Sequence, residues 1–183
     1  MRHLATAFLL AVLPALAAAE DYAPLKTDRA VGLMRHALAP GVGDPSGFDL
    51  SDCTTQRTLD DRGRAQARKT GAALREAGVT FDEVWTSQWC RARNTALLLD
   101  VGPVIEVPAL NSHFAGQGDR AAQTEEIRQK LAGLPMGKRV LLVTHQVNIS
   151  ALSGSSTTSG EIIAAARGDE GSLEILDRYV IAP

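Results

Sequence analysis

The sequence predicts an α/β fold, a three-layer αβα sandwich in which helices cover both faces of a mainly parallel sheet. Two apolar runs, residues 31–34 and 140–143, are typical of strands that are buried on both faces of such a sheet. Helix-forming segments alternate with these and with weaker strands, and the order βαβαβαβ implies parallel pairing with right-handed crossovers. The carboxyl ends of the parallel strands then meet at one edge, where α/β proteins bind their ligands.

The chain begins with the pattern of a secretory signal peptide, residues 1–19. Met1-Arg2-His3 is positively charged, residues 4–16 are mostly apolar, and Ala17-Ala18-Ala19 is typical of a cleavage site. The apolar run is shorter than the roughly 20 residues that a membrane-spanning helix needs, and charged residues follow it at once. We therefore expect export to the periplasm, no stable insertion into the membrane, and a single mature domain of residues 20–183.

A long loop and a helix follow the first strand. Residues 37–58 are rich in Gly, Pro, Asp and Ser, which predicts an irregular loop over the end of the strand. A helix is expected from residue 59 to residue 77. Asp60 and Asp61 suit its first turn, and Gly78 stops it.

Shorter segments complete the alternation of strands and helices. Their apolar content and the turn residues between them predict strands at 81–86, 104–107 and 139–144, helices at 91–100 and 123–133, and a closing hairpin of 161–166 and 172–181. The Ser/Thr/Gly stretch at 153–160 is short enough to be a loop.

Composition limits the partners that this chain can have. The formal net charge is -2 and no basic run occurs, which argues against nucleic acid as a partner. The two cysteines, Cys53 and Cys90, would meet an oxidising compartment after export, so we expect a disulfide between them, with two buried free thiols as the alternative. No coiled-coil pattern is present, and we expect a monomer.

Both strongly buried strands end in a histidine. His36 follows Arg35 at the end of the first, His145 follows the second, and Arg91 lies at the expected start of a helix whose N-terminus favours anions. A divalent metal is not expected, because no carboxylate adjoins either histidine and two fixed cations would repel the ion. Arginine offers forked donors that match phosphate oxygens, and a neutral imidazole can attack phosphorus. The sequence therefore predicts a site for a small phosphorylated substrate, with no metal and no organic cofactor.

These residues resemble the signatures of the histidine phosphatase superfamily, whose fold is phosphoglycerate mutase-like. Arg35-His36, Ser87-x-x-x-Arg91-x-x-x-Thr95-Ala96 and Val143-Thr144-His145 match the signatures in order and spacing, and the resemblance covers essentially the whole mature chain. It implies that His36 is the nucleophile that becomes phosphorylated, that Arg35 and Arg91 hold the phosphate, and that His145 completes the pocket. The segments around Arg91 and His145 are most similar to small exported members, which include phosphatases proposed to act on phosphorylated sugar of the lipopolysaccharide core.

Three positions depart from the family pattern. Ala37 stands where glycine is common, and Gln146 replaces the glycine or aspartate that often follows the second histidine; Gln146 is a candidate substrate-binding residue. Ser112 takes the place of the glutamate that serves as general acid in the mutases, and a serine cannot protonate a leaving alkoxide efficiently near neutral pH. Mutase activity is therefore not expected.

The source of the missing proton stays open at this point. His113 is adjacent, has a reference pKa near 6.5, and could bind substrate or donate a proton if it points inward. Asp49, Asp52 and Asp119 lie in loops that could approach the site. Alternatively the substrate has a good leaving group, as a phosphoramidate or an acyl phosphate does, and needs no strong acid.

The sequence thus predicts an exported phosphatase that hydrolyses a phosphomonoester, with an envelope sugar phosphate as the candidate substrate. The hydrolysis would pass through a covalent phosphohistidine on His36. The alternative is a non-catalytic periplasmic binder of phosphorylated sugars or polyanions, which the missing acid would explain. An exported phosphatase of protein phosphohistidine is a third reading, although the usual partners of such an enzyme are cytoplasmic.

Overall fold

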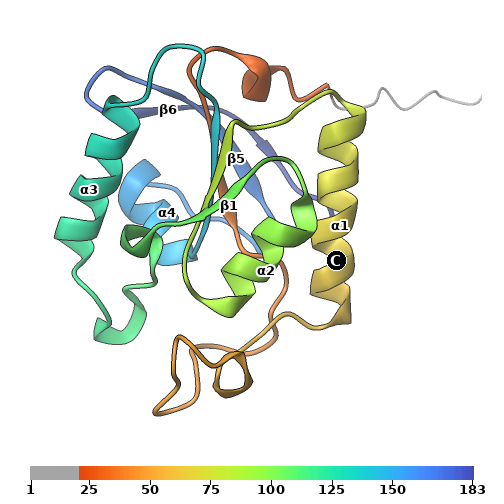
Figure 1. Cartoon of the computed structure of the whole chain (residues 1–183), viewed down its shortest axis with the longest axis vertical. Helices are drawn as coiled ribbons and strands as arrows, with labels where there is room; N and C mark the ends of the chain where they lie inside the picture. Colours follow the sequence, from red (N-terminus) through yellow and green to blue (C-terminus); the bar gives the residue numbers. More distant parts are fainter. Residues whose placement is uncertain (1–20) are drawn as a thin grey trace, which may run out of the picture.

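A computed structural model describes residues 21–183, which form a six-stranded sheet flanked by helices (Figure 1). The predicted signal peptide, residues 1–19, lies outside the described residues. The strands are arranged in the order β3-β2-β4-β1-β5-β6. Their bounds are β1 Ala30–Arg35, β2 Glu83–Thr86, β3 Val104–Glu106, β4 Val140–Thr144, β5 Ile162–Arg167 and β6 Leu173–Tyr179.

The sheet is mainly parallel, as predicted. β1 pairs in parallel with β4, and β2 pairs in parallel with both β4 and β3. The closing hairpin adds β5 antiparallel to β1 and β6 antiparallel to β5. Arg35 is the register partner of Thr144, so the residues that follow β1 and β4 leave the sheet side by side.

Helices cover both faces of the sheet, which confirms the predicted three layers. Figure 1 shows α1 and α2 on one side and α3 and α4 on the other. The hydrophobic core is likewise divided into two clusters, one on each face of the sheet. Successive residues of β4 point to opposite faces, so Leu141 packs with α1 and α2, and Leu142 packs with α3 and α4. The helix bounds are α1 Asp61–Glu76, α2 Cys90–Leu99, α3 Arg120–Ala132 and α4 Gln146–Ser153.

α1 and α2 lie within one or two residues of their predicted bounds, and the larger differences concern α3 and α4. α3 begins at Arg120 rather than at residue 123, because Asp119 caps it by accepting hydrogen bonds from the backbone N–H groups of Ala121 and Ala122. α4 was not expected at all. It has eight residues, several of them polar or β-branched, so its sequence carries no helical periodicity, and it gains its stability by packing Ile149 into the core.

Close packing holds the long loop against α1. Asp60 caps α1 by accepting a hydrogen bond from the backbone N–H of Gly63 at 2.8 Å. A Cβ at Gly63 would lie 1.9 Å from the carbonyl oxygen of Leu38, so only glycine allows the loop to approach this closely. The start of the loop is thereby fixed directly after β1.

The predicted disulfide is present between Cys53 and Cys90, whose Cα atoms are 5.7 Å apart. Cys53 belongs to the loop at 37–58, which lies below the sheet in Figure 1. Cys90 is the first residue of α2. The bond therefore ties the loop to the helix end that carries Arg91.

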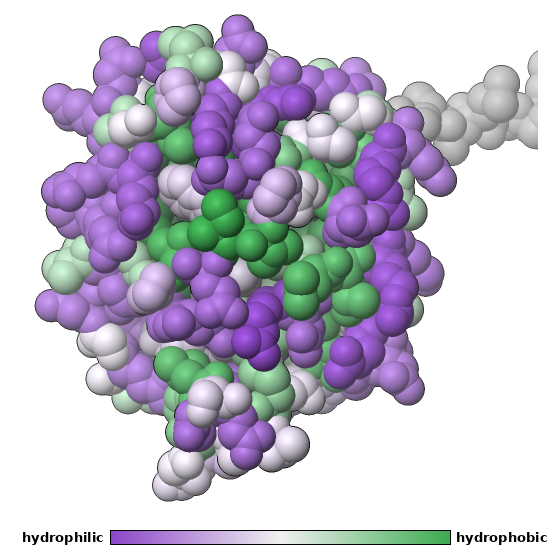
Figure 2. Space-filling model, in the orientation of Figure 1, coloured by the Kyte–Doolittle hydropathy of each residue, from purple (hydrophilic) through white to green (hydrophobic). Residues whose placement is uncertain are grey.

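The surface is hydrophilic over most of the face seen in Figure 2, with an apolar area near its middle, over α2 and β3. Leu97 of α2 and Ile105 of β3 are exposed large hydrophobic residues. Within residues 21–183, no helix has the length and apolar character needed to cross a membrane.

Candidate active site

The two predicted histidines come together at one edge of the sheet. His36 directly follows β1, and His145 directly follows the neighbouring strand β4. Their ring centroids are 5.5 Å apart with an angle of 65° between the planes. Parallel pairing of two strands that are each followed by a histidine thus produces the juxtaposition that the sequence predicted.

The surroundings of His36 fix its tautomer. The side chain is buried, and Nδ1 lies 2.8 Å from the carbonyl oxygen of Ala37. Because a carbonyl oxygen only accepts, Nδ1 carries the proton and Nε2 keeps a free electron pair. Burial, and then the charge of Arg91, hold the pKa of His36 well below its usual value. His36 is therefore a neutral imidazole with a nucleophilic Nε2 at neutral pH.

His145 is oriented by a hydrogen-bonded chain. Its Nε2 lies 2.9 Å from the hydroxyl of Ser87, which donates in turn to Oδ1 of Asn111 at 3.2 Å. Ser87 then accepts from Nε2–H, and Nδ1 is the unprotonated nitrogen. The ring of Trp89 packs edge-on against His145 with centroids 5.4 Å apart. Burial, followed by the proximity of His36, holds the pKa of His145 well below its usual value.

Neutral histidines make stability depend on pH. The unfolded chain takes up protons on both imidazoles below about pH 6.5, whereas the folded protein does not until a lower pH. The unfolded state thus binds more protons in this window, and stability rises with pH through it. We expect a lower free energy of unfolding at about pH 5 than at about pH 7.5, measured by urea denaturation. The difference should shrink in a His36→Asn/His145→Asn variant; an unchanged difference there would contradict the assignment.

Two arginines predicted from the sequence reach the same site. Arg91 lies in the first turn of α2 and is buried, and Arg35 is the half-buried last residue of β1. The Nε atoms of both are buried without a hydrogen-bond partner among the described residues. Buried donors of this kind need an acceptor, and an anion in the pocket would supply it.

The backbone directly after His36 is joined to the helix that carries Arg91. The hydroxyl of Thr95 accepts from the N–H of Ala37 at 3.0 Å and donates to the carbonyl oxygen of Arg91 at 2.7 Å. α2 and α4 both begin at the pocket, and their N-termini favour negative charge there.

Two charged residues of the site were missed from the sequence. Asp44 and Arg57 lie in the loop at 37–58 and line the pocket. Arg57 donates through Nε to the carbonyl oxygen of Gly43 at 2.8 Å and through another nitrogen to that of Ala39. Burial, and then the charge of Arg91, lower the pKa of Arg57 to about 10, so it stays charged at neutral pH. In the sequence, Asp44 stands in a Gly-Asp-Pro turn and Arg57 stands shortly before α1. Neither pattern is specific for a binding site.

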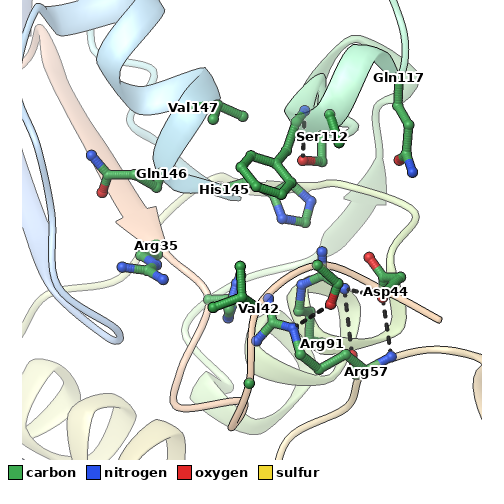
Figure 3. Close-up of a pocket in the computed structure, with 15 residues that line it drawn as sticks. Arg35, Val42, Asp44, Arg57, Arg91, Ser112, Gln117, His145, Gln146 and Val147 are labelled. Atoms are coloured by element: carbon green, nitrogen blue, oxygen red, sulfur yellow. Dashed lines mark hydrogen bonds and ion pairs between the residues drawn. The ribbon is translucent and has the colours of Figure 1, made fainter.

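These side chains enclose a cavity of about 290 Å³ (Figure 3). Figure 3 shows Arg35 and Gln146 on one side of it, Asp44 and Arg57 on the other, and His145 between them. The lining residues are Arg35, His36, Gly41, Val42, Gly43, Asp44, Arg57, Arg91, Ser112, Phe114, Ala115, Gln117, His145, Gln146 and Val147.

The remaining candidates divide between the pocket and its surroundings. Gln146 lines the pocket, where its side-chain oxygen accepts from Thr157, and Ser112 lines it as a buried hydroxyl. His113 does not line the pocket; burial, and then the charge of Arg120, lower its pKa.

The aspartates proposed from the sequence as acids lie outside the lining. Asp49 accepts a hydrogen bond from the hydroxyl of Ser51, and Asp52 accepts one from the backbone N–H of Thr54. Asp119 caps α3. Asp44 is thus the one carboxylate among the described lining residues.

The pocket combines a buried, neutral imidazole whose Nε2 is unprotonated with a positively charged lining. Three guanidinium groups, from Arg35, Arg57 and Arg91, provide positive charge that a tetrahedral phosphate would match. Within residues 21–183, no group of three or more His, Cys, Asp or Glu residues could hold a metal ion. The protein is thus an α/β protein in which two histidines and three arginines line one pocket, an arrangement suited to binding phosphate beside a histidine.

The chain belongs to the histidine phosphatase superfamily (branch 1), whose family model matches residues 33–132, just over half of the chain. The matched segment includes His36, both predicted arginines and the whole long loop. It ends before β4 and His145, which the structure brings to the same site.

Curated relatives match a shorter part of the chain. The mitochondrial serine/threonine-protein phosphatase Pgam5 of Drosophila virilis is 44% identical over 71 residues, which are 39% of this chain and 22% of the relative. The Pgam5 of Drosophila grimshawi is 45% identical over 49 residues, 27% of this chain and 17% of the relative. The matched part of the chain thus spans about a fifth of the length of these relatives.

Solved structures share the fold at low sequence identity. The protein histidine phosphatase SixA complexed with tungstate superposes with a TM-score of 0.60 at 19% identity, covering 82% of this chain and 96% of that one. A putative alpha-ribazole-5'-P phosphatase from Escherichia coli gives 0.61 at 21%, covering 84% and 96%. Phosphoglycerate mutase from Plasmodium falciparum gives 0.53 at 20%, covering 81% and 88%. These structures confirm the predicted phosphoglycerate mutase-like fold.

Proposed function

We propose that this protein is an exported, metal-independent phosphatase that hydrolyses a phosphomonoester through a covalent phosphohistidine on His36. The observation that carries the proposal is the buried, neutral His36 with its Nε2 free, set among three arginines. Membership of the histidine phosphatase superfamily, and the phosphatases among its relatives, support the reaction class.

The reaction would proceed in two displacements at phosphorus. Nε2 of His36 attacks, the bond from phosphorus to the leaving-group oxygen breaks, and that oxygen departs with the electron pair. Arg35 and Arg91 hold the phosphoryl oxygens, whose negative charge is distributed in the transition state. A water molecule then attacks the phosphohistidine, which releases inorganic phosphate and restores neutral His36. His145 contacts the transferring group from the end of the neighbouring strand, β4.

The leaving group should decide the rate. Asp44 is the one carboxylate among the described lining residues, and although burial alone would raise its pKa, hydrogen bonds from Arg91, the N–H of Arg57 and Trp89 hold it below the usual value. An ionised aspartate cannot supply a proton at neutral pH. We therefore expect kcat/KM for an aryl phosphate to exceed that for an alkyl phosphate by at least about 100-fold, a difference in the range of general acid catalysis.

Steady-state hydrolysis of the two esters in excess chelator measures this ratio and tests the proposed function at the same time. Equal values of kcat/KM for the two esters would show that a general acid operates in the site, because kcat/KM reports the first displacement and not hydrolysis of the shared phosphohistidine. Loss of all activity in chelator, restored by a divalent metal, would overturn metal independence.

We also propose a phosphorylated sugar of the bacterial envelope as the substrate and the periplasm as the location. Support comes from the signal-like residues 1–19 and from the sequence similarity to small exported members of the family. The disulfide between Cys53 and Cys90 is consistent with an oxidising compartment. We expect a monomer that acts on small phosphorylated molecules.

The described lining residues include no carboxylic acid that is protonated at neutral pH, which favours one other candidate, a non-catalytic binder of phosphorylated sugars or polyanions. This candidate predicts that inorganic phosphate binds the protein but that aryl phosphates are not turned over. The hydrolysis experiment above distinguishes the two directly.

A further inference from the structure

Asp44 meets Arg91 inside the pocket in an arrangement that the reaction described above does not use. Oδ1 of Asp44 accepts from a terminal nitrogen of Arg91 at 2.7 Å, and both side chains are only 4% exposed. Oδ1 also accepts from the backbone N–H of Arg57 at 3.0 Å, and Oδ2 accepts from Nε1 of Trp89 at 3.0 Å. Donors on three sides therefore fix the carboxylate.

The loop that carries Asp44 is itself tied to α2. The disulfide joins Cys53 to Cys90, and the side-chain oxygen of Gln56 accepts from the N–H of Cys90 at 2.9 Å. Arg57 binds the carbonyl oxygen of Gly43, next to Asp44, from the other end of the loop. Asp44 is thus held in place relative to the helix turn from which Arg91 extends.

A carboxylate beside a phosphate-binding arginine is costly for substrate binding. It repels the phosphate dianion and uses one of the donors of Arg91. The long side chain of Arg91, by contrast, would otherwise sample many rotamers, and a fixed partner holds its guanidinium in one orientation. The remaining donors, including the unpartnered Nε, then point in a fixed direction.

We propose that Asp44 is a positioning residue that orients Arg91 for the phosphoryl-transfer transition state, at the expense of affinity for the ground-state phosphate. This inference rests on the proposed phosphatase function. It predicts that removing the charge of Asp44 lowers catalysis while phosphate binding is kept or becomes tighter. A purely structural role would weaken both together.

The test compares wild-type protein, Asp44→Asn and Asp44→Glu. We expect Asp44→Asn to lower kcat by about 10- to 100-fold, the size of a misplaced catalytic group, while the inhibition constant of inorganic phosphate stays equal or falls. Orthovanadate, which mimics the five-coordinate transition state, should bind at least about 10-fold more weakly to Asp44→Asn. Asp44→Glu should recover part of kcat.

A matched control is Asp169→Asn. Asp169 pairs with Arg29 at the same 2.7 Å, but at the surface, where its side chain is 89% exposed. This variant should behave as wild type. An unchanged kcat in Asp44→Asn, or parallel losses of kcat, phosphate binding and thermal stability, would overturn the proposal. Calorimetry measures phosphate and vanadate binding without turnover. The predicted opposite changes in these two affinities therefore test the role of Asp44 even if the wild-type protein hydrolyses no ester.

Discussion

Replacement of His36 by alanine is expected to lower the hydrolysis of an aryl phosphate by at least about 10³-fold, the usual scale for loss of a catalytic nucleophile. The variant loses a buried, neutral imidazole whose Nε2 carries a free electron pair and which shares the pocket with three arginines. An aryl phosphate is the right substrate for this comparison, because its leaving group needs no acid.

Phosphate binding provides the control for the His36→Ala variant. Arg35, Arg57 and Arg91 remain in place, so the affinity for inorganic phosphate should change by less than about 10-fold. Added imidazole should restore part of the rate by filling the space of the lost ring. Hydrolysis by the variant at more than about a tenth of the wild-type rate would exclude His36 as the nucleophile.

Removal of the disulfide in a Cys53→Ala/Cys90→Ala variant is expected to lower the free energy of unfolding by about 4 kcal/mol in the chain-entropy model, given the separation of 37 residues. The bond closes the loop that carries Asp44 and Arg57 onto α2. Because this loop would gain freedom next to the pocket, kcat/KM should fall as well. Urea denaturation measures the first effect and aryl phosphate hydrolysis the second.

Reduction of the wild-type protein should reproduce both effects of the double variant. Protein recovered from the periplasm without reductant should also resist thiol alkylation at Cys53 and Cys90. A loss of stability below about 1 kcal/mol would show that the bond adds little to this fold. Alkylation of both thiols in unreduced periplasmic protein would show that the bond does not form there.

The parts of the fold that were predictable are those with a local sequence signal. The runs at 31–34 and 140–143 are apolar without alternation because both faces of β1 and β4 are buried, and the histidines that follow were expected at one edge for that reason. Arg91 was identified in the same way, from its place at a helix start. Strand ends and helix starts are therefore the positions at which sequence reasoning found the site.

The parts that were missed depend on contacts distant in sequence. Asp44 reaches Arg91, 47 residues away, because the loop folds back onto α2. No periodic pattern in the sequence predicts how an irregular loop folds. Arg57 binds carbonyl groups at the opposite end of the same loop. α4 is a helix because Ile149 packs in the core, although its sequence is a weak helix former. His113 was a candidate substrate-binding residue because it adjoins Ser112. Ser112 lines the pocket, but His113 does not.

The central claim is that His36 itself carries the phosphoryl group during turnover. The most direct measurement mixes the protein with excess aryl phosphate, quenches in alkali within a turnover, and locates the phosphoryl group by mass spectrometry of the peptides. The account predicts a phosphoryl group on the peptide that contains His36, present in wild type and absent from His36→Ala. A phosphoryl group on His145 or on a serine, or turnover with an unmodified His36 throughout, would contradict it.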